Sequence, residues 1–177
     1  GPFNHSVFYT VTSFTTVHDI YNIFIIELKN LQKKINKISN RHIQLKRDNQ
    51  HINVDLLQFS LTGDSSQNPF LRRGDIIKIG YIQDHASIWG GVNRPQSYEF
   101  VSGESILNLI HLAGGTTTLA DEAKIDVTSF VNGQKRTRHY SITELKNVMV
   151  EPDQIILVHE NNFKKRQTIV NINGEVK

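Results

Sequence analysis

One phrase of glycines, prolines and strand residues occurs twice in this 177-residue chain, once complete and once in outline. The complete copy begins at residues 88–95 (IWGGVNRP), which read as a strand that runs into a Gly/Pro turn. A short strand, a helix, the glycine stop at 113–115, a hairpin and a strand behind the acidic turn at 152–153 follow. Because parts of this order recur elsewhere, the sequence predicts a tandem array of small domains.

Three pairs of matching segments occur in the same order along the chain. The matched segments are 71–79 with 150–158 at an offset of 79 residues, 88–92 with 172–176 at an offset of 84, and, more weakly, 43–45 with 125–127. A single short match carries little weight, but three in order at similar offsets indicate an internal repeat.

The complete unit predicts one helix held by a mixed sheet. Ser102 or Ser105 is the expected N-cap, and the spacing of Ile106, Leu109 and Ile110 predicts an apolar stripe on the helix. The glycines at 114–115 end that helix, and Asn-Gly at 132–133 predicts a hairpin turn. The strand at 155–158 closes the sheet. This order is an α+β, β-grasp (ubiquitin-like) arrangement.

The other unit follows the same plan with two departures. Its helix is expected to begin at residues 13–16 and, lacking a glycine stop, to run further, toward Ile35. It also lacks the opening strand, whereas a spare strand occurs at 169–176, which either begins a further unit or completes the first one. The predicted boundaries are 3–80 for the degenerate first unit, 81–162 for the well-preserved second unit and 163–177 for the linker and spare strand.

Composition excludes several classes of protein. The chain has no cysteine, which rules out disulfides, thiolate catalysis and cysteine-based zinc sites. The net charge is +3, and Lys and Arg are dispersed rather than clustered, so no nucleic-acid partner is expected. No stretch approaches the roughly 18 apolar residues of a membrane-spanning helix.

No motif predicts an enzyme, a metal site or a cofactor. The sequence has no Gly-x-Ser-x-Gly elbow and no His-Glu-x-x-His, EF-hand or P-loop pattern. The glycines at 114–115 follow a helix, so a helix C-cap is favoured over a phosphate loop. Asp75 and Asp153 admit a cation site, but acidic residues in turns more often bond their own backbone, and that interpretation is favoured.

Trp89 is the strongest candidate for a binding residue. Alternation along its strand places Ile88, Gly90 and Val92 on the inward face, so Trp89 points outward. An outward aromatic side chain can stack on a sugar ring or anchor a subunit contact, with Asn93, Arg94 and Tyr98 as polar neighbours. Packing of Trp89 against the adjacent repeat is the alternative.

The motif residues together resemble the soluble-ligand-binding β-grasp (SLBB) domain of bacterial polysaccharide export proteins. The resemblance is strong over residues 82–158, moderate over 13–79, and limited to one strand beyond 168. The residues that carry it are Gly74, Asp75, Gly90, Pro95, Ala113, Gly114, Gly115, Pro152 and Asp153.

This resemblance implies a non-catalytic module of a capsule or exopolysaccharide export protein, in the periplasm or outer membrane of a Gram-negative-type bacterium. The implied partners are polysaccharide, other copies of the chain and subunits of the export machinery. Two alternatives stay open: an accessory or ligand-binding β-grasp module of a cofactor or redox complex, and a structural spacer that binds only copies of itself.

Overall fold

Two units make up the structure, a computed structural model that describes residues 7–31 and 37–161. The described residues up to His85 and the segment Glu99–Glu104 form the first unit. Ala86–Tyr98 and the described residues from Ser105 onward form the second. Each unit is described by itself.

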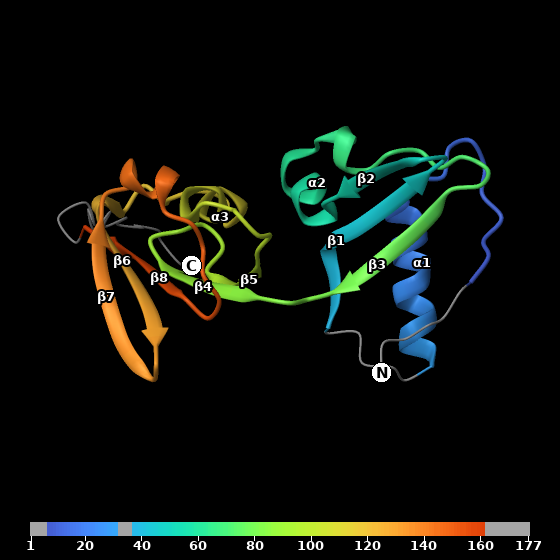
Figure 1. Cartoon of the computed structure of the whole chain (residues 1–177). Helices are drawn as coiled ribbons and strands as arrows, with labels where there is room; N and C mark the ends of the chain where they lie inside the picture. Colours follow the sequence, from blue (N-terminus) through green and yellow to red (C-terminus); the bar gives the residue numbers. More distant parts are fainter. Residues whose placement is uncertain (1–6, 32–36, 162–177) are drawn as a thin grey trace, which may run out of the picture. The chain divides into compact units, whose positions relative to one another are not determined.

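The first unit packs helices against a three-stranded sheet in the order β2-β1-β3 (Figure 1). Its elements are α1 (Val17–Asn30), β1 (Ile38–Arg47), β2 (Gln50–Val54), α2 (Leu56–Thr62), a 3-10 turn (Ser65–Gln67) and β3 (Ile76–Tyr81). Strand β1 pairs antiparallel with both neighbours. The mixed sheet expected of each unit is therefore not found in the described part of this one.

Helix α1 begins where the sequence predicts it. The Thr16 side chain accepts a hydrogen bond from the Asp19 backbone, and the Asp19 carboxylate accepts one from the Thr16 backbone, a complete capping box. The helix covers the sheet through its apolar stripe. Its residues join residues of β1, β2, α2 and the segment before β3 in one buried core of Val17, Ile20, Ile43, Leu45, Val54, Leu56 and Leu71.

Helix α1 is 14 residues long, twice the seven of its counterpart in the second unit, as expected from its missing glycine stop. It ends at Asn30 with Leu31 as its C-cap, and Ile35 lies outside the described residues.

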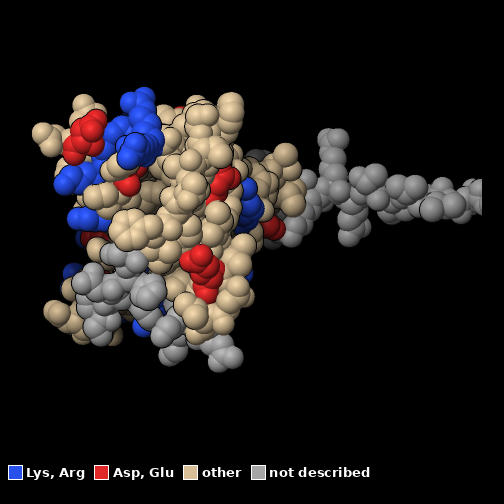
Figure 2. All heavy atoms as spheres, turned by 90° about the vertical axis from the view of Figure 1, so that its right-hand side faces the viewer, with Lys and Arg blue, Asp and Glu red and all other residues tan. Residues whose placement is uncertain are grey.

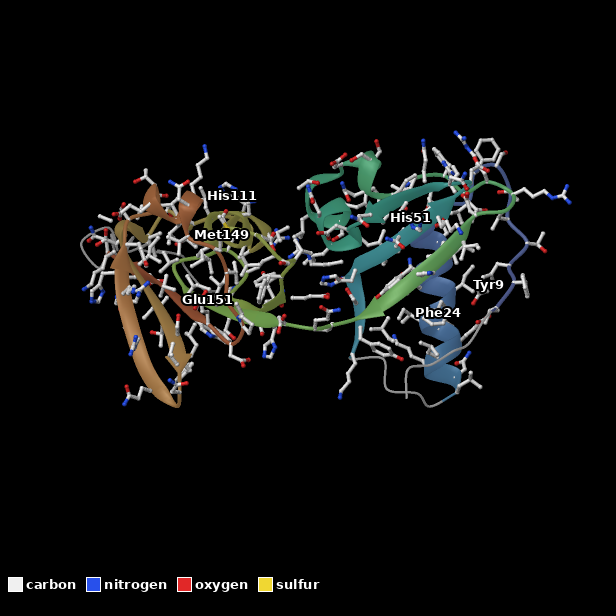
Figure 3. The ribbon with its side chains drawn as sticks, viewed as in Figure 1. Tyr9, Phe24, His51, His111, Met149 and Glu151 are labelled. Carbon is white, nitrogen blue, oxygen red and sulfur yellow. The ribbon has the colours of Figure 1, made fainter. Side chains whose placement is uncertain are left out.

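The segment before the helix is held to it by Tyr9. The Tyr9 hydroxyl, beside α1 in Figure 3, donates a hydrogen bond to the Glu27 carboxylate at 2.6 Å.

The second unit has a five-stranded sheet in the order β5-β4-β8-β6-β7 (Figure 1). Its elements are β4 (His85–Gly90), β5 (Gln96–Glu99), α3 (Ile106–Leu112), β6 (Ala120–Val131), β7 (Gln134–Tyr140), a 3-10 turn (Glu144–Asn147) and β8 (Ile155–Glu160). Strands β4 and β8 are parallel, whereas β6 is antiparallel to β7 and β8. This sheet is mixed, and the closing strand β8 lies at its centre, as predicted.

Helix α3 ends at the predicted glycine pair. Its N-cap is Ser105, and Ala113 is its C-cap. The Gly114 N–H donates to the His111 carbonyl and the Gly115 N–H to the Ile110 carbonyl, both at 2.9 Å, which is a Schellman motif. Both glycines have positive φ, a conformation that other residues adopt at a cost.

The turns before β3 and β8 are built alike. The Arg72 N–H donates to the Asp75 carboxylate at 2.8 Å, and the Glu151 N–H donates to the Gln154 side-chain oxygen at 3.0 Å. The left-handed residues of these turns are Gly74 (φ +89°) and Asp153 (φ +59°). Each residue of one turn has its counterpart 79 positions later in the other.

The strand ladders of the two units also share their register. The corresponding pairs are Ile43–Ile79 and Leu45–Ile77 in the first unit and Ile125–Val158 and Val127–Ile156 in the second. A register shift interrupts each ladder, after Ile38 in one and after Ala120 in the other. Each β1 residue of these pairs corresponds to the β6 residue 82 positions later, and each β3 residue corresponds to the β8 residue 79 positions later.

Strands β4 and β5 have no strand counterpart in the described part of the first unit. The segment 169–176, which the sequence offers as a completing strand, lies outside the described residues. Within residues 7–31 and 37–161, no helix combines the length and apolar character needed to cross a bilayer.

The face drawn in Figure 2 is largely uncharged, with basic side chains gathered toward one edge.

Candidate functional site

The outer face of the second unit's sheet presents Trp89. On β4, Ala86 and Ile88 are fully buried, whereas the Trp89 side chain between them and the turn is 47% exposed. The outward direction predicted from strand alternation is therefore confirmed. Since large aromatic side chains are usually buried, an exposed tryptophan in the middle of a sheet marks a candidate contact surface.

Trp89 belongs to a row of side chains that crosses four strands. It lies opposite Leu157 on β8, which lies opposite Asp126 on β6, which lies opposite His139 on β7. Directly opposed residues project from the same face of a sheet. Ile155, two residues before Leu157 on β8, is also partly exposed, at 38%. This row thus has an apolar half, Trp89 and Leu157, and a polar half, Asp126 and His139.

Asp126 fixes two histidines along the polar half. One carboxylate oxygen contacts His139 Nδ1 at 2.7 Å and the other contacts His159 Nε2 at 2.9 Å. The hydrogen bond from His159, followed by that from His139, lowers the pKa of Asp126 below its usual value. Among the described residues no group of three or more acidic and histidine side chains is arranged to hold a metal ion. The trio supplies oriented polar groups beside the apolar half.

Asn93 and Arg94 lie at the end of α3. The Asn93 side-chain amide donates to the Gly114 carbonyl at 2.7 Å, and the Arg94 backbone N–H donates to the Ala113 carbonyl at 2.9 Å. The Arg94 guanidinium donates to the Leu112 carbonyl at 3.4 Å. These groups satisfy carbonyls that the helix leaves without an internal partner, and the guanidinium suits the negative end of the helix dipole. Both residues stabilise the glycine turn.

Tyr98 is not a surface residue, contrary to the expectation that it flanks Trp89. It is only 3% exposed, and its hydroxyl donates to the Arg94 carbonyl at 2.6 Å. Burial raises the pKa of this phenol above its ordinary value. Among the described residues no side-chain hydrogen bond joins Trp89 to Asn93, Arg94 or Tyr98. Three of the four sequence candidates therefore gather around the α3 terminus, and Trp89 stands with Leu157.

Gly90 also departs from expectation. It does not share the inward face of β4: it is exposed and has φ +83°, and a Cβ there would collide with the Val158 carbonyl oxygen. A Cβ on the buried Gly91 would come within 3.0 Å of Ala120. Only glycine allows β4 to run this close to β8 and then turn. Pro95 is exposed in the turn that follows.

Asp75 is held by the first unit's own groups. Besides the Arg72 N–H, it binds both Nε and Nη2 of Arg47, at 3.0 and 2.7 Å. The Arg47 hydrogen bond lowers the pKa of Asp75. This supports the backbone-bonding interpretation of the turn over the cation-site one. Pro152 lies exposed in the corresponding turn before β8.

Sequence reasoning missed a buried ionic cluster in the first unit. The Arg41 side chain is 2% exposed; its Nε donates to Asp55 at 2.8 Å, and its Nη1 and Nη2 donate to Glu104 at 2.8 and 3.0 Å. Arg41 Nη1 also donates to the Glu99 carbonyl at 2.7 Å, and His42 Nδ1 contacts the Glu99 carboxylate at 2.6 Å. One signal was available, because Arg41 is in phase with the inward residues Ile43 and Leu45 on β1.

The comparison with protein families concerns the second unit. Residues 86–138 are an SLBB domain. The matched SLBB segment runs from β4 into β7 and contains Trp89, Gly90, Asn93 and the Schellman turn of α3. The SLBB domain is a type of ligand-binding module found in polysaccharide export proteins. No curated protein matches the chain.

Proposed function

We propose that the chain is a non-catalytic periplasmic module of a capsule or exopolysaccharide export protein. In this proposal both units are β-grasp domains in tandem, and the outer sheet face of the second unit contacts glycan. The module belongs to an export apparatus associated with the outer membrane. The SLBB domain at residues 86–138 supports the assignment, because this domain type is found in polysaccharide export proteins.

The tandem arrangement is supported by structural features that occur within both units. Helix N-caps, hairpins, strand registers, register shifts and the turns before β3 and β8 correspond in the same order along both units, and the registers and turns do so at constant spacing. Such correspondence in hydrogen bonding is difficult to reach in two unrelated folds. It supports the proposal that the first unit is a shortened copy of the same domain.

Glycan contact by the second unit depends above all on one observation, the exposed Trp89 beside Leu157. Sugar rings have apolar faces that stack on aromatic side chains, while their hydroxyls need polar partners. The Trp89 row offers both, since the indole and Leu157 lie next to Asp126 and His139. An assembly surface is the second candidate, favoured by the partly exposed Ile155 and Leu157 on the same face.

The test is a calorimetric titration of the chain with oligosaccharide fragments of the surface polysaccharide from the bacterium that encodes it. Wild type is compared with Trp89→Ala and with the control Phe14→Ala, which removes another exposed aromatic side chain, 81% exposed and located in the first unit. The proposal predicts saturable binding that Trp89→Ala weakens about tenfold or more, since truncation of a tryptophan anchor at a binding surface commonly costs about 2 kcal/mol.

Equal loss in both variants would contradict a site at Trp89. Absence of binding by wild type at millimolar sugar would overturn glycan contact by this module. If Trp89→Ala instead shifts a concentration-dependent self-association measured by sedimentation, the face is an assembly surface.

A further inference from the structure

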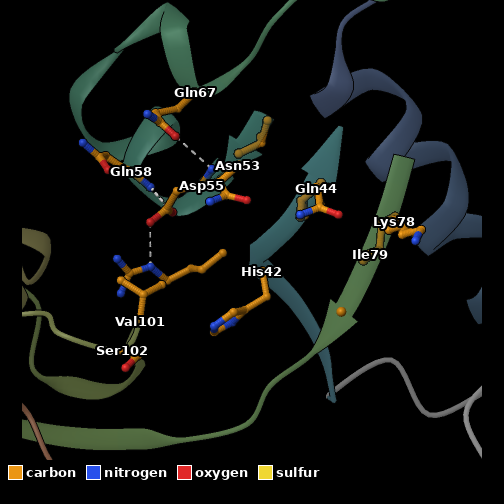
Figure 4. A pocket seen from close by; sticks show the side chains of 14 residues that line it. His42, Gln44, Asn53, Asp55, Gln58, Gln67, Lys78, Ile79, Val101 and Ser102 are labelled. Carbon is orange, nitrogen blue, oxygen red and sulfur yellow. Dashed lines mark hydrogen bonds and ion pairs between the residues drawn. The ribbon is translucent and has the colours of Figure 1, made fainter. Parts of the chain in front are cut away.

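The first unit contains an open hollow of about 670 Å³ whose lining residues all belong to that unit (Figure 4). Its floor is the face of the β2-β1-β3 sheet that points away from the α1 core. Gln58 of α2, Gln67 and the segment with Val101 and Ser102 form its walls. We call this hollow the amide cleft, because four of its lining residues are Gln44, Asn53, Gln58 and Gln67.

Three of the lining residues form a row across the sheet floor. Gln44 on β1 lies opposite Asn53 on β2 and opposite Lys78 on β3, so their side chains project from one face. The structure gives no intramolecular hydrogen bond to the side chains of Gln44, Asn53 or Lys78 within the described residues. Two planar amides and one ammonium group are therefore free to bind a ligand.

The charge of this face has one sign. Two residues further along β1, on the same face, Lys46 lies opposite His51 on β2, labelled in Figure 3, and opposite Ile76 on β3. The outward-facing residues around the cleft floor are His42, Gln44, Lys46, His51, Asn53, Ile76 and Lys78, and none is acidic. The acidic lining residue, Asp55, is bound to Arg41 at 2.8 Å and to the Gln58 N–H at 2.8 Å. Glu99 and Glu104, which lie beside the lining, are bound to His42 and Arg41. The unpaired charged side chains of the sheet face, Lys46 and Lys78, are both cationic and favour an anion.

From these observations we propose that the amide cleft binds a carboxylate-bearing saccharide. Each amide donates and accepts hydrogen bonds, as sugar hydroxyls do, so Gln44 and Asn53 can bond hydroxyl groups on neighbouring sugar carbons. Lys78 pairs with the carboxylate, and Lys46 extends the positive surface along the strand. This inference rests on the proposed function and narrows it: the polysaccharide is acidic, and the first unit selects for its charge.

The lining favours a saccharide over a nucleic acid, the other polyanion to consider. Sites for single-stranded nucleic acid stack bases on aromatic side chains. The fourteen lining residues include no Phe, Tyr or Trp, so neither a base nor a sugar ring can stack on an aromatic side chain here, and a saccharide is recognised through its hydroxyl and carboxylate groups. An amide-lined cleft with a single free lysine is suited to hydroxyl groups and an isolated carboxylate.

The test titrates the whole chain with hexagalacturonate, an acidic hexasaccharide, and with maltohexaose, a neutral one, by calorimetry and by nitrogen-15 NMR. We expect saturable binding of hexagalacturonate, at least about tenfold tighter than maltohexaose, with shifts of the Gln44 and Asn53 side-chain amides. Lys78→Ala should weaken binding about tenfold, as expected for one charge-assisted bond. The control Lys146→Ala, which removes an exposed lysine of the second unit, should leave binding unchanged.

The variants separate this inference from the proposed function. Binding of hexagalacturonate that Lys78→Ala weakens and Trp89→Ala leaves intact supports the amide cleft. Binding that Trp89→Ala abolishes and Lys78→Ala leaves intact overturns the cleft and keeps glycan contact at Trp89. Equal affinity for the neutral hexamer overturns charge selection, and no binding of either sugar or of the native polysaccharide overturns both proposals. The amide shifts are read in wild type, so they stand even if a variant misfolds.

Discussion

Replacing Arg41 with methionine should destabilise the first unit severely. The substitution keeps an unbranched, buried side chain but removes the cation between two carboxylates that are themselves largely buried, with side-chain exposures of 12% for Asp55 and 7% for Glu104. Four hydrogen bonds of 2.7–3.0 Å are lost with the guanidinium. Removing one partner of a buried ion pair commonly costs about 3–5 kcal/mol, because the remaining charge has no compensation.

Both carboxylates keep one backbone partner, which places the expected cost at the lower end. Asp55 still accepts from the Gln58 N–H at 2.8 Å, and Glu104 from the Val101 N–H at 3.2 Å. We expect a loss of about 3 kcal/mol, which is about a 150-fold increase in the population of the opened unit. Hydrogen exchange of the β1 amides measures this opening, because β1 forms the centre of the sheet.

Two further variants make the result decisive. Arg138→Met removes an exposed arginine on β7 and should change β1 exchange less than threefold, because exposed charges contribute little. Adding Asp55→Asn and Glu104→Gln to Arg41→Met removes the uncompensated charges and should recover more than half of the loss. If Arg41→Met alone raises exchange less than tenfold, the cluster is not a net stabilising element and the reasoning is refuted.

Two other predictions concern backbone strain and pH. Gly90→Ala forces a Cβ toward the Val158 carbonyl at φ +83° and should lower the free energy of unfolding of the second unit, measured in urea, by at least about 2 kcal/mol. The control Gly133→Ala, at φ +73° with open space around it, should lower it by only about 1 kcal/mol. Equal losses would contradict the close approach of β4 to β8. Arg47 holds the pKa of Asp75 low in the folded state, so the pair's stabilisation is present above the unfolded value near 4 and is lost as the pH falls through the folded value. Asp75→Asn should therefore flatten the decline of thermal stability below about pH 4, and an unchanged slope would show that other groups cause it.

The elements that the sequence predicts best are those set by local backbone preferences. Gly114 and Gly115 end α3 in a Schellman turn, and Asn132 adopts a left-handed conformation (φ +51°) at the predicted hairpin. In both places a short-range requirement for positive φ restricts the choice of residue. The internal repeat was visible mainly in the apolar strands β3 and β8, because the aligned residues of the turns before them differ, Gly74 and Asp75 standing against Asp153 and Gln154.

What sequence reasoning missed depends on distant partners. Arg41 and Glu104 are 63 residues apart, and nothing near Arg41 indicates which carboxylate it binds. The direction of Trp89 followed from alternation within a strand, but the burial of Tyr98 depends on how the short strand β5 lies beside β4 at the edge of the sheet. Gly90 was misplaced because a left-handed residue breaks the alternation on which the prediction relied.

The most direct test of glycan contact uses the fluorescence of Trp89, the single tryptophan of the chain. The indole is half-exposed on the outer face, so a sugar ring stacked on it should shift its emission to shorter wavelength as water is displaced. We predict a saturable blue shift on titration with fragments of the encoding bacterium's surface polysaccharide. Emission that stays unchanged up to millimolar sugar would contradict glycan binding at this face.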